Sequence, residues 1–550
     1  MPLSESIDGI IAFLQPAMRR GSIGRIRRGV EKEGLRVEPD GRVSQQPHPL
    51  ELGSKLTHPY ITTDYSEALL EYVTPVFCKP SKALEFLVDL HRFTYRYIGR
   101  EVVWPASMPA LLEGNESIPI ADFGTSNKGR MKHVYRRGLD VRYGRIMQSI
   151  AGIHYNVSLP DELWQILAAH EAGKAEATSL DAAAMADMRS RGYFRIIRNF
   201  RRHSWILKYL FGASPAIDRS FLDGRDDTEF DKVGQRTLIS RYASSLRMSD
   251  LGYQNKVQNR LSVSYDSLKD YIKTLRYAVS TAWPDYERFS SRGEIGENGK
   301  DGWQQLNANI LQIENEFYSD IRPKRVVRHH QTPTQALEAE GVEYIEVRCL
   351  DINPLLPVGI DETVMRFIDT FLMFCLLSTD AVITREEEDA LTTNQARIVR
   401  QGRDPELTLI DQGEELPLAV VGHRIFKEMR KVAELLDIGE EEASPHIDAL
   451  DALAPRLDAP ELTPAGLIYK VLTENDEDFV EWTLEQARSQ ASSFRAHPLD
   501  KARDALFEQL SETSRIQQGD LERDDTLSFE EFVALYFEKS HRVAQASERH

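Results

Sequence analysis

Two glutamates, Glu31 and Glu33, stand two residues apart in a segment where apolar and charged residues alternate from Arg28 to Val37. Such alternation predicts a β-strand, and side chains at positions i and i+2 of a strand point to the same face. The two carboxylates therefore project together, in a row that Leu35 and Val37 continue. Taken alone, this charged strand is more typical of a solvated edge, because basic residues flank it. The rest of the chain reverses that interpretation.

Two later strands repeat the arrangement. The stretch 150–159 alternates cleanly, with His154 and Asn156 on its polar face. The stretch 343–350 places Glu346 and Arg348 on one face and apolar residues on the other. Both patterns predict strands that carry a polar pair next to an apolar face.

A fourth segment, residues 61–75, adds the acids Asp64, Glu67 and Glu71. Its pattern fits a helix or a strand, and we expect Glu67 and Glu71 to point the same way in either. If these segments share a sheet, one face carries several carboxylates, an imidazole and a guanidinium. Unpaired carboxylates are costly to bury, so bound divalent cations are the natural compensation. Oxygen ligands with at most one imidazole suit Mg²⁺ or Mn²⁺ better than zinc.

Hard cations next to an arginine are also what phosphoryl transfer from a nucleotide requires. The residues alone thus predict a metal-dependent, nucleotide-using enzyme built on an antiparallel sheet. They do not indicate its substrate.

Three other stretches contain polar or charged patterns of low specificity. The loop Gly124–Arg130 has the composition of a phosphate cradle but lacks the GxxxxGK[ST] order, so we expect a plain loop. The stretch 520–531 imitates an EF-hand, yet its sixth position is Asp525 where the turn requires glycine; a helix capped by Ser528 and Glu531 explains it more simply. The basic stretch 322–325 predicts a turn that either contacts nucleotide phosphates or is structural.

The composition limits the partners. A formal net charge of −18 over 550 residues argues against a nucleic-acid partner. Three scattered cysteines and no CxxC exclude a disulfide framework and a thiolate zinc site, so a reducing cytoplasm is the default compartment. No stretch resembles a signal peptide or a membrane span. We expect small-molecule substrates and no membrane contact, and a monomer is compatible with the sequence.

The remaining elements are mostly helical. Helices are predicted over 5–20, 81–99, 192–211 and an exposed, Ala-rich excursion at 161–191. The loop 242–253 has a composition that suits ligand contact, and 290–302 is expected to be mobile. Beyond residue 362 the pattern is helical and acidic.

These motifs together resemble the proteobacterial glutamate–cysteine ligases. The resemblance runs in the family's order over residues 25–375 and weakens beyond 385. The segments that carry it are 29–37, 56–58, 61–64, 67–71, 124–127, 152–156, 209–216, 249–253, 311–316, 321–325 and 343–348.

The resemblance implies an α+β fold like the glutamine-synthetase core, in which a curved antiparallel sheet flanked by helices forms a funnel-shaped active site. It implies a catalytic domain over residues 1–380 and a mostly helical C-terminal region over 381–550, packed on that core. The implied reaction joins the γ-carboxylate of L-glutamate to the amine of L-cysteine at the expense of ATP, with Mg²⁺ or Mn²⁺, in the first step of glutathione synthesis.

Matching positions imply roles for individual residues. The metal ligands are Glu31, Glu33, Asp64, Glu71, His154 and Glu346, while Glu67 is left as a supporting acid. Arg348 and Arg136 resemble the groups that hold the transferred phosphoryl. The substrate-binding residues are Tyr135, Arg247, Tyr253, Tyr318, Tyr65, Leu139 and Gln148, and Arg322 and Lys324 are weaker candidates for nucleotide contact. Two alternatives stay open: a related ligase with another small amine acceptor, and a non-catalytic regulatory homologue.

Overall fold

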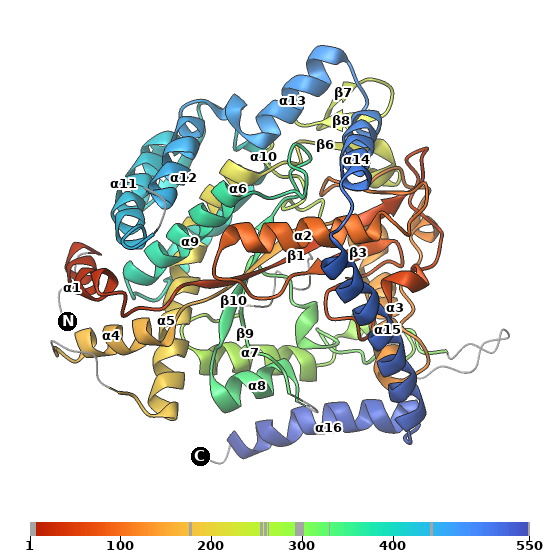
Figure 1. Cartoon of the computed structure of the whole chain (residues 1–550), viewed down its shortest axis with the longest axis horizontal. Helices are drawn as coiled ribbons and strands as arrows, with labels where there is room; N and C mark the ends of the chain where they lie inside the picture. Colours follow the sequence, from red (N-terminus) through yellow and green to blue (C-terminus); the bar gives the residue numbers. More distant parts are fainter. Residues whose placement is uncertain are drawn as a thin grey trace.

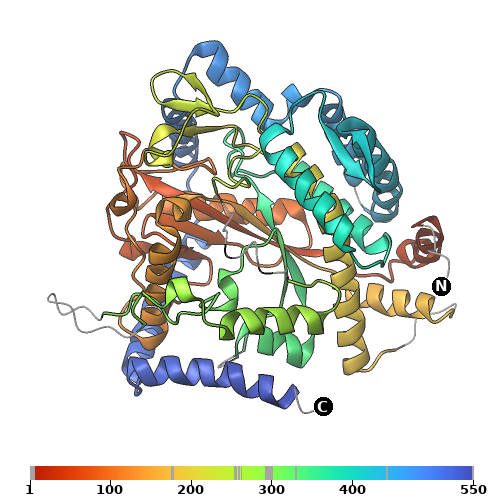
Figure 2. The same cartoon turned by 180° about the vertical axis from the view of Figure 1, so that it is seen from behind.

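The structure is a computed structural model that describes residues 7–174, 179–252, 257, 261, 263–291, 302–328, 331–440 and 444–547, the last nine as backbone only. An open antiparallel sheet forms its centre, with strands in the order β2-β3-β1-β5-β10-β9 and β4 paired to β1 (Figures 1 and 2). The strands are β1 (Arg27–Val37), β2 (Ile61–Thr63), β3 (Leu69–Val73), β4 (Val102–Val103), β5 (Ile153–Ser158), β9 (Ile321–Lys324) and β10 (Tyr344–Leu350).

Helices α2 (Pro80–Thr94) and α9 (Glu362–Leu377) cover one face of this sheet, and α2 lies along β1 in Figure 1. Lys32 points from β1 to His91 of α2, with Nζ 3.0 Å from Nε2. Arg28 of β1 forms an ion pair of 2.7 Å with Asp369 of α9. Because side chains alternate along β1, Glu31 and Glu33 project from the opposite face.

The remaining helices surround this centre. In the first two thirds of the chain they are α1 (Ile7–Arg19), α3 (Asn127–Tyr143), α4 (Asp161–Glu171), α5 (Ala182–His203), α6 (Trp205–Phe211), α7 (Leu268–Ser280) and α8 (Pro333–Glu340). The rest are α10 (Arg385–Gln401), α11 (Leu418–Leu436), α12 (Pro445–Leu453), α13 (Pro464–Asn475), α14 (Phe479–Ala496), α15 (Lys501–Asp524) and α16 (Phe529–Ser547).

Two small sheets complete the fold: β6 (Ala216–Asp218), β8 (Thr237–Ile239) and β7 (Asp231–Val233) in one, and the hairpin β11 (Thr408–Asp411) with β12 (Glu414–Pro417) in the other. One cluster of buried apolar side chains extends from Ile10 to Phe507 and so joins both parts of the chain. The division at residue 380 stays a prediction. In the part of the chain that the structure describes, no helix meets both the length and the hydropathy needed to span a membrane.

The expected α+β class, the three polar-pair strands and the helical C-terminal third are all observed. The ambiguous segment 61–75 forms strands β2 and β3. Four expectations were wrong in detail. Residues 127–130 open helix α3 because Ser126 caps it, the basic stretch 322–325 is mostly strand β9, and the acidic third contains the hairpin β11–β12. Helix α4 is no exposed excursion, since Trp164 and its apolar neighbours are buried. Most of the stretch 290–302 lies outside the described residues.

Candidate active site

Strand register brings four of the expected ligands to one face. In the antiparallel ladder Glu31 is opposite His154 of β5, and Glu33 is opposite Glu71 of β3. Directly opposed residues of antiparallel strands share a face. His154 Nδ1 lies 3.1 Å from Glu31 Oε2, and its Nε2 lies 3.9 Å from Glu33 Oε1. Asn156 Nδ2 donates to Glu31 Oε1 at 2.9 Å, which orients that carboxylate.

Strand β10 adds Glu346, which is opposite Asn156 on one side and Arg322 on the other. Ligand atoms of Glu31, His154 and Glu346 all lie within 4.8 Å of one another, a separation that one cation can bridge. Arg348 Nη1 is 3.1 Å and Lys324 Nζ 3.2 Å from the Glu346 carboxylate. The acids therefore meet a border of cations.

The electrostatics divide the acids into two groups. Burial raises the pKa of Glu71, and the carboxylates of Glu31 and Asp64 raise it further, well above its usual value. Burial also raises the pKa of Glu33, against the opposing charge of His154. Burial would raise the pKa of Glu346 as well, but Lys324 and Arg348 hold it well below its usual value. Cations therefore dominate around Glu346 on β10, whereas burial and neighbouring carboxylates dominate around Glu71 on β3.

Asp64 follows β2 and meets helix α3. Arg136 Nε donates to the backbone oxygen of Asp64 at 2.5 Å, and its Nη2 lies 4.0 Å from the Asp64 carboxylate. Arg136 and Lys132 are one helical turn apart and both lie over the ring of the buried Phe123, at 4.5 and 4.8 Å. Phe123 is therefore a platform that aims two cations of α3 at the acidic face.

Lys132 was not predicted as a site residue. Burial lowers its pKa to about 8, with the positive charge of Arg136, although Glu71 and Asp64 act in the opposite direction. In the described part of the chain no hydrogen bond or ion pair engages its ammonium group. The sequence predicts a loop over 124–130 and no helix directly after it, so no spacing rule identifies Lys132.

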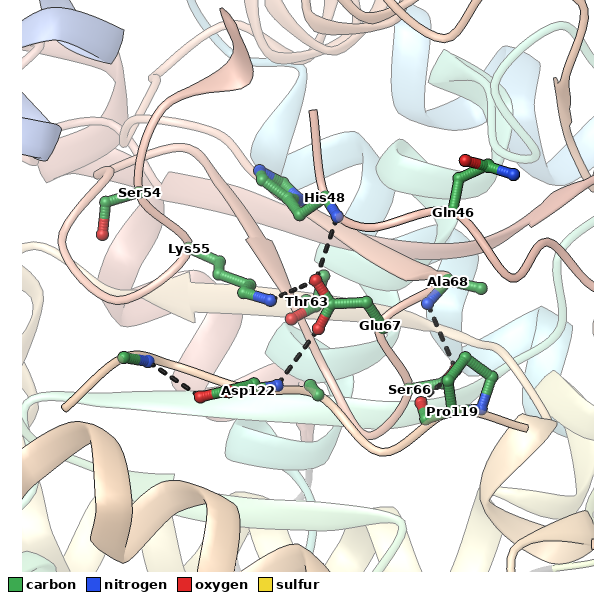
Figure 3. A network of polar contacts seen from close by, with 12 residues as sticks. Gln46, His48, Ser54, Lys55, Thr63, Ser66, Glu67, Ala68, Pro119 and Asp122 are labelled. Carbon is green, nitrogen blue, oxygen red and sulfur yellow. Dashed lines mark hydrogen bonds and ion pairs between the residues drawn. The ribbon is translucent and has the colours of Figure 1, made fainter. Parts of the chain in front are cut away.

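Glu67 lies in the turn before β3 and not in the strand, so its carboxylate does not share the partners of Glu71. It accepts hydrogen bonds from Lys55 Nζ and from the backbone N–H groups of His48 and Asp122, the latter two at 3.0 and 3.1 Å (Figure 3). These contacts tie three loops together. Glu67 therefore pairs with Lys55 and holds these loops together.

The expected substrate residues gather beside α3. Gln148 Nε2 donates to Tyr318 Oη at 3.1 Å, and burial together with Glu316 and Tyr318 raises the pKa of Tyr135. Tyr65 and Leu139 are buried nearby in the same apolar cluster. Tyr253 lies outside the described residues.

Arg247 is buried and is held by contacts with Arg348 and Asp351. Its Nη2 donates to the backbone oxygen of Arg348 at 3.0 Å, and its Nη1 lies 3.6 Å from Asp351 Oδ1. Asp351 in turn accepts hydrogen bonds from Ser245 Oγ at 3.0 Å and Ala213 N at 2.9 Å. The guanidinium occupies the space that a side chain at Gly152 would need. Asp351 therefore helps to hold Arg247 in place, and no pattern in the sequence had singled it out.

Of the two weaker nucleotide candidates, Lys324 reaches the acidic face through Glu346. The guanidinium of Arg322 is buried and donates to the backbone oxygens of Asn315, at 3.1 Å, and of Phe317. Arg322 thus holds the segment 315–317, and as the register partner of Glu346 it lies on the same face of the sheet.

Comparisons with known proteins give matches over most of the chain. The family model described as glutamate-cysteine ligase matches residues 11–398. A glutamate–cysteine ligase of Pseudomonas putida is 47% identical over 508 residues, which cover 92% of this chain and 94% of the relative. One of Pseudomonas aeruginosa is 46% identical over 534 residues, covering 97% and 98%.

Solved structures give the same result. The crystal structure of a glutamate–cysteine ligase from Francisella tularensis in complex with AMP superposes with a TM-score of 0.85 at 33% identity, over 94% of this chain and 98% of that one. A bifunctional glutathione synthetase from Pasteurella multocida gives a TM-score of 0.69 at 25% identity, over 92% of this chain and 58% of that one.

Proposed function

The chain belongs to the glutamate–cysteine ligase family, and we infer that it is an enzyme that joins L-glutamate to L-cysteine. It catalyses this ligation with ATP as co-substrate, in glutathione synthesis. A carboxylate is a poor acylating agent until one of its oxygens becomes a leaving group. Phosphorylation of the glutamate γ-carboxylate solves this problem, and the cysteine amine then displaces phosphate.

The observation that carries the site assignment is the convergence of acids and one imidazole on one face of the sheet. We propose that Glu31, Glu33, Asp64, Glu71, His154 and Glu346 hold divalent cations, Mg²⁺ or Mn²⁺. The donors fit, since five of the six are carboxylates with hard oxygen ligands and only one is an imidazole. Three of the six already lie within 4.8 Å of one another. A bound Mg²⁺ supplies neutralisation of phosphate oxygens, which otherwise repel an attacking carboxylate.

Around that face, Arg348 and Arg136 are proposed to hold the transferred phosphoryl group. Arg348 lies next to Glu346 and Arg136 next to Asp64, so each guanidinium borders the acidic face from a different side. The planar fork of an arginine matches two phosphate oxygens at once, which a lysine cannot do. Lys324, and more weakly Arg322, are proposed to approach the nucleotide from β9.

The aromatic wall is proposed to bind the amino-acid substrates. Tyr135, Tyr65 and Leu139 would exclude water from the acyl phosphate, which must not hydrolyse before the amine arrives. Gln148, Tyr318, Arg247 and Tyr253 would supply polar contacts. The catalytic region is proposed to comprise residues 1–380, with 381–550 packed on it. The three cysteines are free thiols, which supports the cytoplasm as the compartment.

The assignment is tested by Glu31→Gln and Glu346→Gln, each of which removes one charge from the proposed cation site and keeps its shape. The control is Glu343→Gln, because Glu343 precedes β10 and contacts Val326 N and Arg325 instead. We expect phosphate release with ATP, glutamate and cysteine to fall at least about a thousandfold in both variants. Mn²⁺ affinity, followed by electron paramagnetic resonance, should fall with it, and cooperative unfolding should persist. Near-normal turnover and Mn²⁺ affinity in both variants would disprove the proposed cation site.

A further inference from the structure

The C-terminal elbow, residues 518–529, is the corner at which α15 ends and α16 begins. It lies against the start of α3, although the contacting residues are 398 positions apart in sequence. Figure 1 shows α15 running down to this corner beside α3. The elbow joins two stretches noted in the sequence, the acidic imitation of an EF-hand and the glycine-containing loop 124–130.

Two carboxylates of the elbow accept hydrogen bonds from backbone N–H groups, one at the first residue of α3 and one in the loop just before its N-cap Ser126. Asp525 accepts a hydrogen bond from Asn127 N, and Glu522 Oε1 accepts one from Thr125 N at 3.0 Å. The side chain of Asn127 donates to the backbone oxygen of Leu527 at 2.9 Å. The first N–H groups of a helix have no partner within the helix and carry partial positive charge, so carboxylates there are stabilising. The side chain of Ser126 accepts from one other N–H group of this first turn, Gly129 N.

Two glycines leave room for α15. Gly124 has φ +86°, and a Cβ there would overlap the side chains of Gln518 and Glu522. Gly53 has φ +85°, and a Cβ there would lie 2.9 Å from Ser511 Cα. Positive φ favours glycine, and here the missing side chain also allows close approach. The docking of α15 is therefore built into the backbone of the catalytic region.

Helix α16 fixes the outer side of α3. Phe529 is buried, its ring centre is 5.3 Å from that of Trp303, and the Arg130 guanidinium lies 4.4 Å from its centre. Val134 of α3 belongs to the same apolar cluster. The opposite side of α3 carries Lys132 and Arg136 toward the acidic face, so the elbow supports the helix from behind.

We propose that the C-terminal elbow positions α3 for the reaction, with Asp525 and Glu522 as positioning residues that act through Tyr135 and Arg136. The proposal rests on the roles given to those two residues above, and it assigns a task to the C-terminal region. Small displacements of groups that orient a substrate can cost about a hundredfold in rate, so a loosened first turn would be visible in the kinetics.

The test neutralises the two carboxylates, with Asp525→Asn, Glu522→Gln and the double variant. Asp525→Glu restores the charge. Glu512→Gln is the control, because it removes an exposed charge of α15 ten residues before Glu522. Hydrogen–deuterium exchange of amides 125–131, kcat and KM for each substrate, and thermal unfolding are measured. We expect the double variant to exchange these amides about tenfold faster and to lose about tenfold in kcat/KM for cysteine, with Mn²⁺ affinity unchanged.

The outcomes separate this proposal from the site assignment. If Arg136→Ala has normal activity, the role given to Arg136 is wrong, whatever the elbow does. If Arg136→Ala is inactive but the double variant has normal kinetic constants, the positioning role is overturned, whether or not the amides exchange faster. If the double variant unfolds, the single variants still decide the test. Asp525→Asn must then lose part of kcat/KM for cysteine, whereas Asp525→Glu and Glu512→Gln must keep it.

Discussion

The substitution Gly152→Ala tests how Arg247 is held. An added Cβ would overlap Nη2 of Arg247 and would lie 2.6 Å from Cζ and 3.0 Å from Nε. These distances are too short for real contacts, so one partner must move. Gly152 also contacts Glu33 on its other side. Its N–H donates to Glu33 Oε2 at 2.6 Å, and its carbonyl oxygen accepts from Glu33 N at 3.1 Å.

The guanidinium is the part that can give way. If Arg247 moves, it loses the hydrogen bond to the carbonyl of Arg348, and a hydrogen bond from a charged group contributes about 1.5–3 kcal/mol. If it stays and the backbone shifts instead, overpacking costs about 1–3 kcal/mol. Both routes converge on about 2 kcal/mol, which corresponds to about thirtyfold in an equilibrium or rate constant. The pairing of Gly152 with Glu33 survives only the first route.

The assay follows from that difference. We expect kcat/KM for cysteine to fall about thirtyfold while Mn²⁺ affinity stays within about twofold, because a displaced side chain leaves Glu33 in place. Gly519→Ala is the control, since Gly519 lies within α15 and a Cβ there meets only Arg523 Nη1 at 3.8 Å. Unchanged cysteine kinetics in Gly152→Ala would refute the positioning of Arg247, and a parallel loss of Mn²⁺ affinity would show that the backbone moved instead.

Two further predictions concern Lys132 and His48. Lys132→Met keeps an apolar side chain on Phe123 but removes the charge, and we expect kcat/KM for ATP to fall about tenfold. The control is Lys128→Met, at an exposed lysine of the same helix, which should keep normal kinetics. Equal behaviour of the two variants would contradict a role for Lys132. His48 is buried and close to Lys55 and Arg36, which lowers its pKa to about 3. Since the unfolded chain protonates at about 6.5, stability is complete above that pH and falls by about 1.4 kcal/mol per unit toward pH 3. The free energy of unfolding, measured with urea between pH 4 and 7, should therefore depend less steeply on pH in His48→Gln than in the natural chain. An identical pH dependence in the two proteins would contradict a neutral buried imidazole.

Alternation along single strands was enough to predict which side chains share a face. Glu31 with Glu33, His154 with Asn156 and Glu346 with Arg348 each project together, as the two-residue period requires. Which strand lies beside which could not be predicted, because pairing is decided by contacts between distant segments. The register that sets Glu31 against His154 joins residues 123 positions apart, and no local pattern encodes it.

Helix α3, by contrast, could not be predicted from local sequence at all. Its sequence is polar and contains Gly129 and Gly138, so the apolar periodicity that reveals most helices is weak. Both glycines serve close packing, since a Cβ at 129 would lie 2.5 Å from the oxygen of Phe123 and one at 138 would overlap the side chain of Gln312. The helix is stabilised by Ser126, by the carboxylates of the elbow and by the Phe123 platform. All but the first are long-range or depend on the fold, so local propensity could not identify the element that carries Lys132 and Arg136.

Glu67 and Glu71 show how two glutamates four residues apart come to lie in different surroundings. The strand that fixes side-chain direction begins at Leu69, between the two. Glu71 is therefore placed by the ladder opposite Glu33, where neighbouring carboxylates raise its pKa and favour a bound cation. Glu67 precedes the ladder, and its carboxylate turns toward Lys55 and backbone N–H groups that neutralise it. Glu71 thus lies among other carboxylates while Lys55 balances the charge of Glu67, and the position of the first paired residue decides this difference.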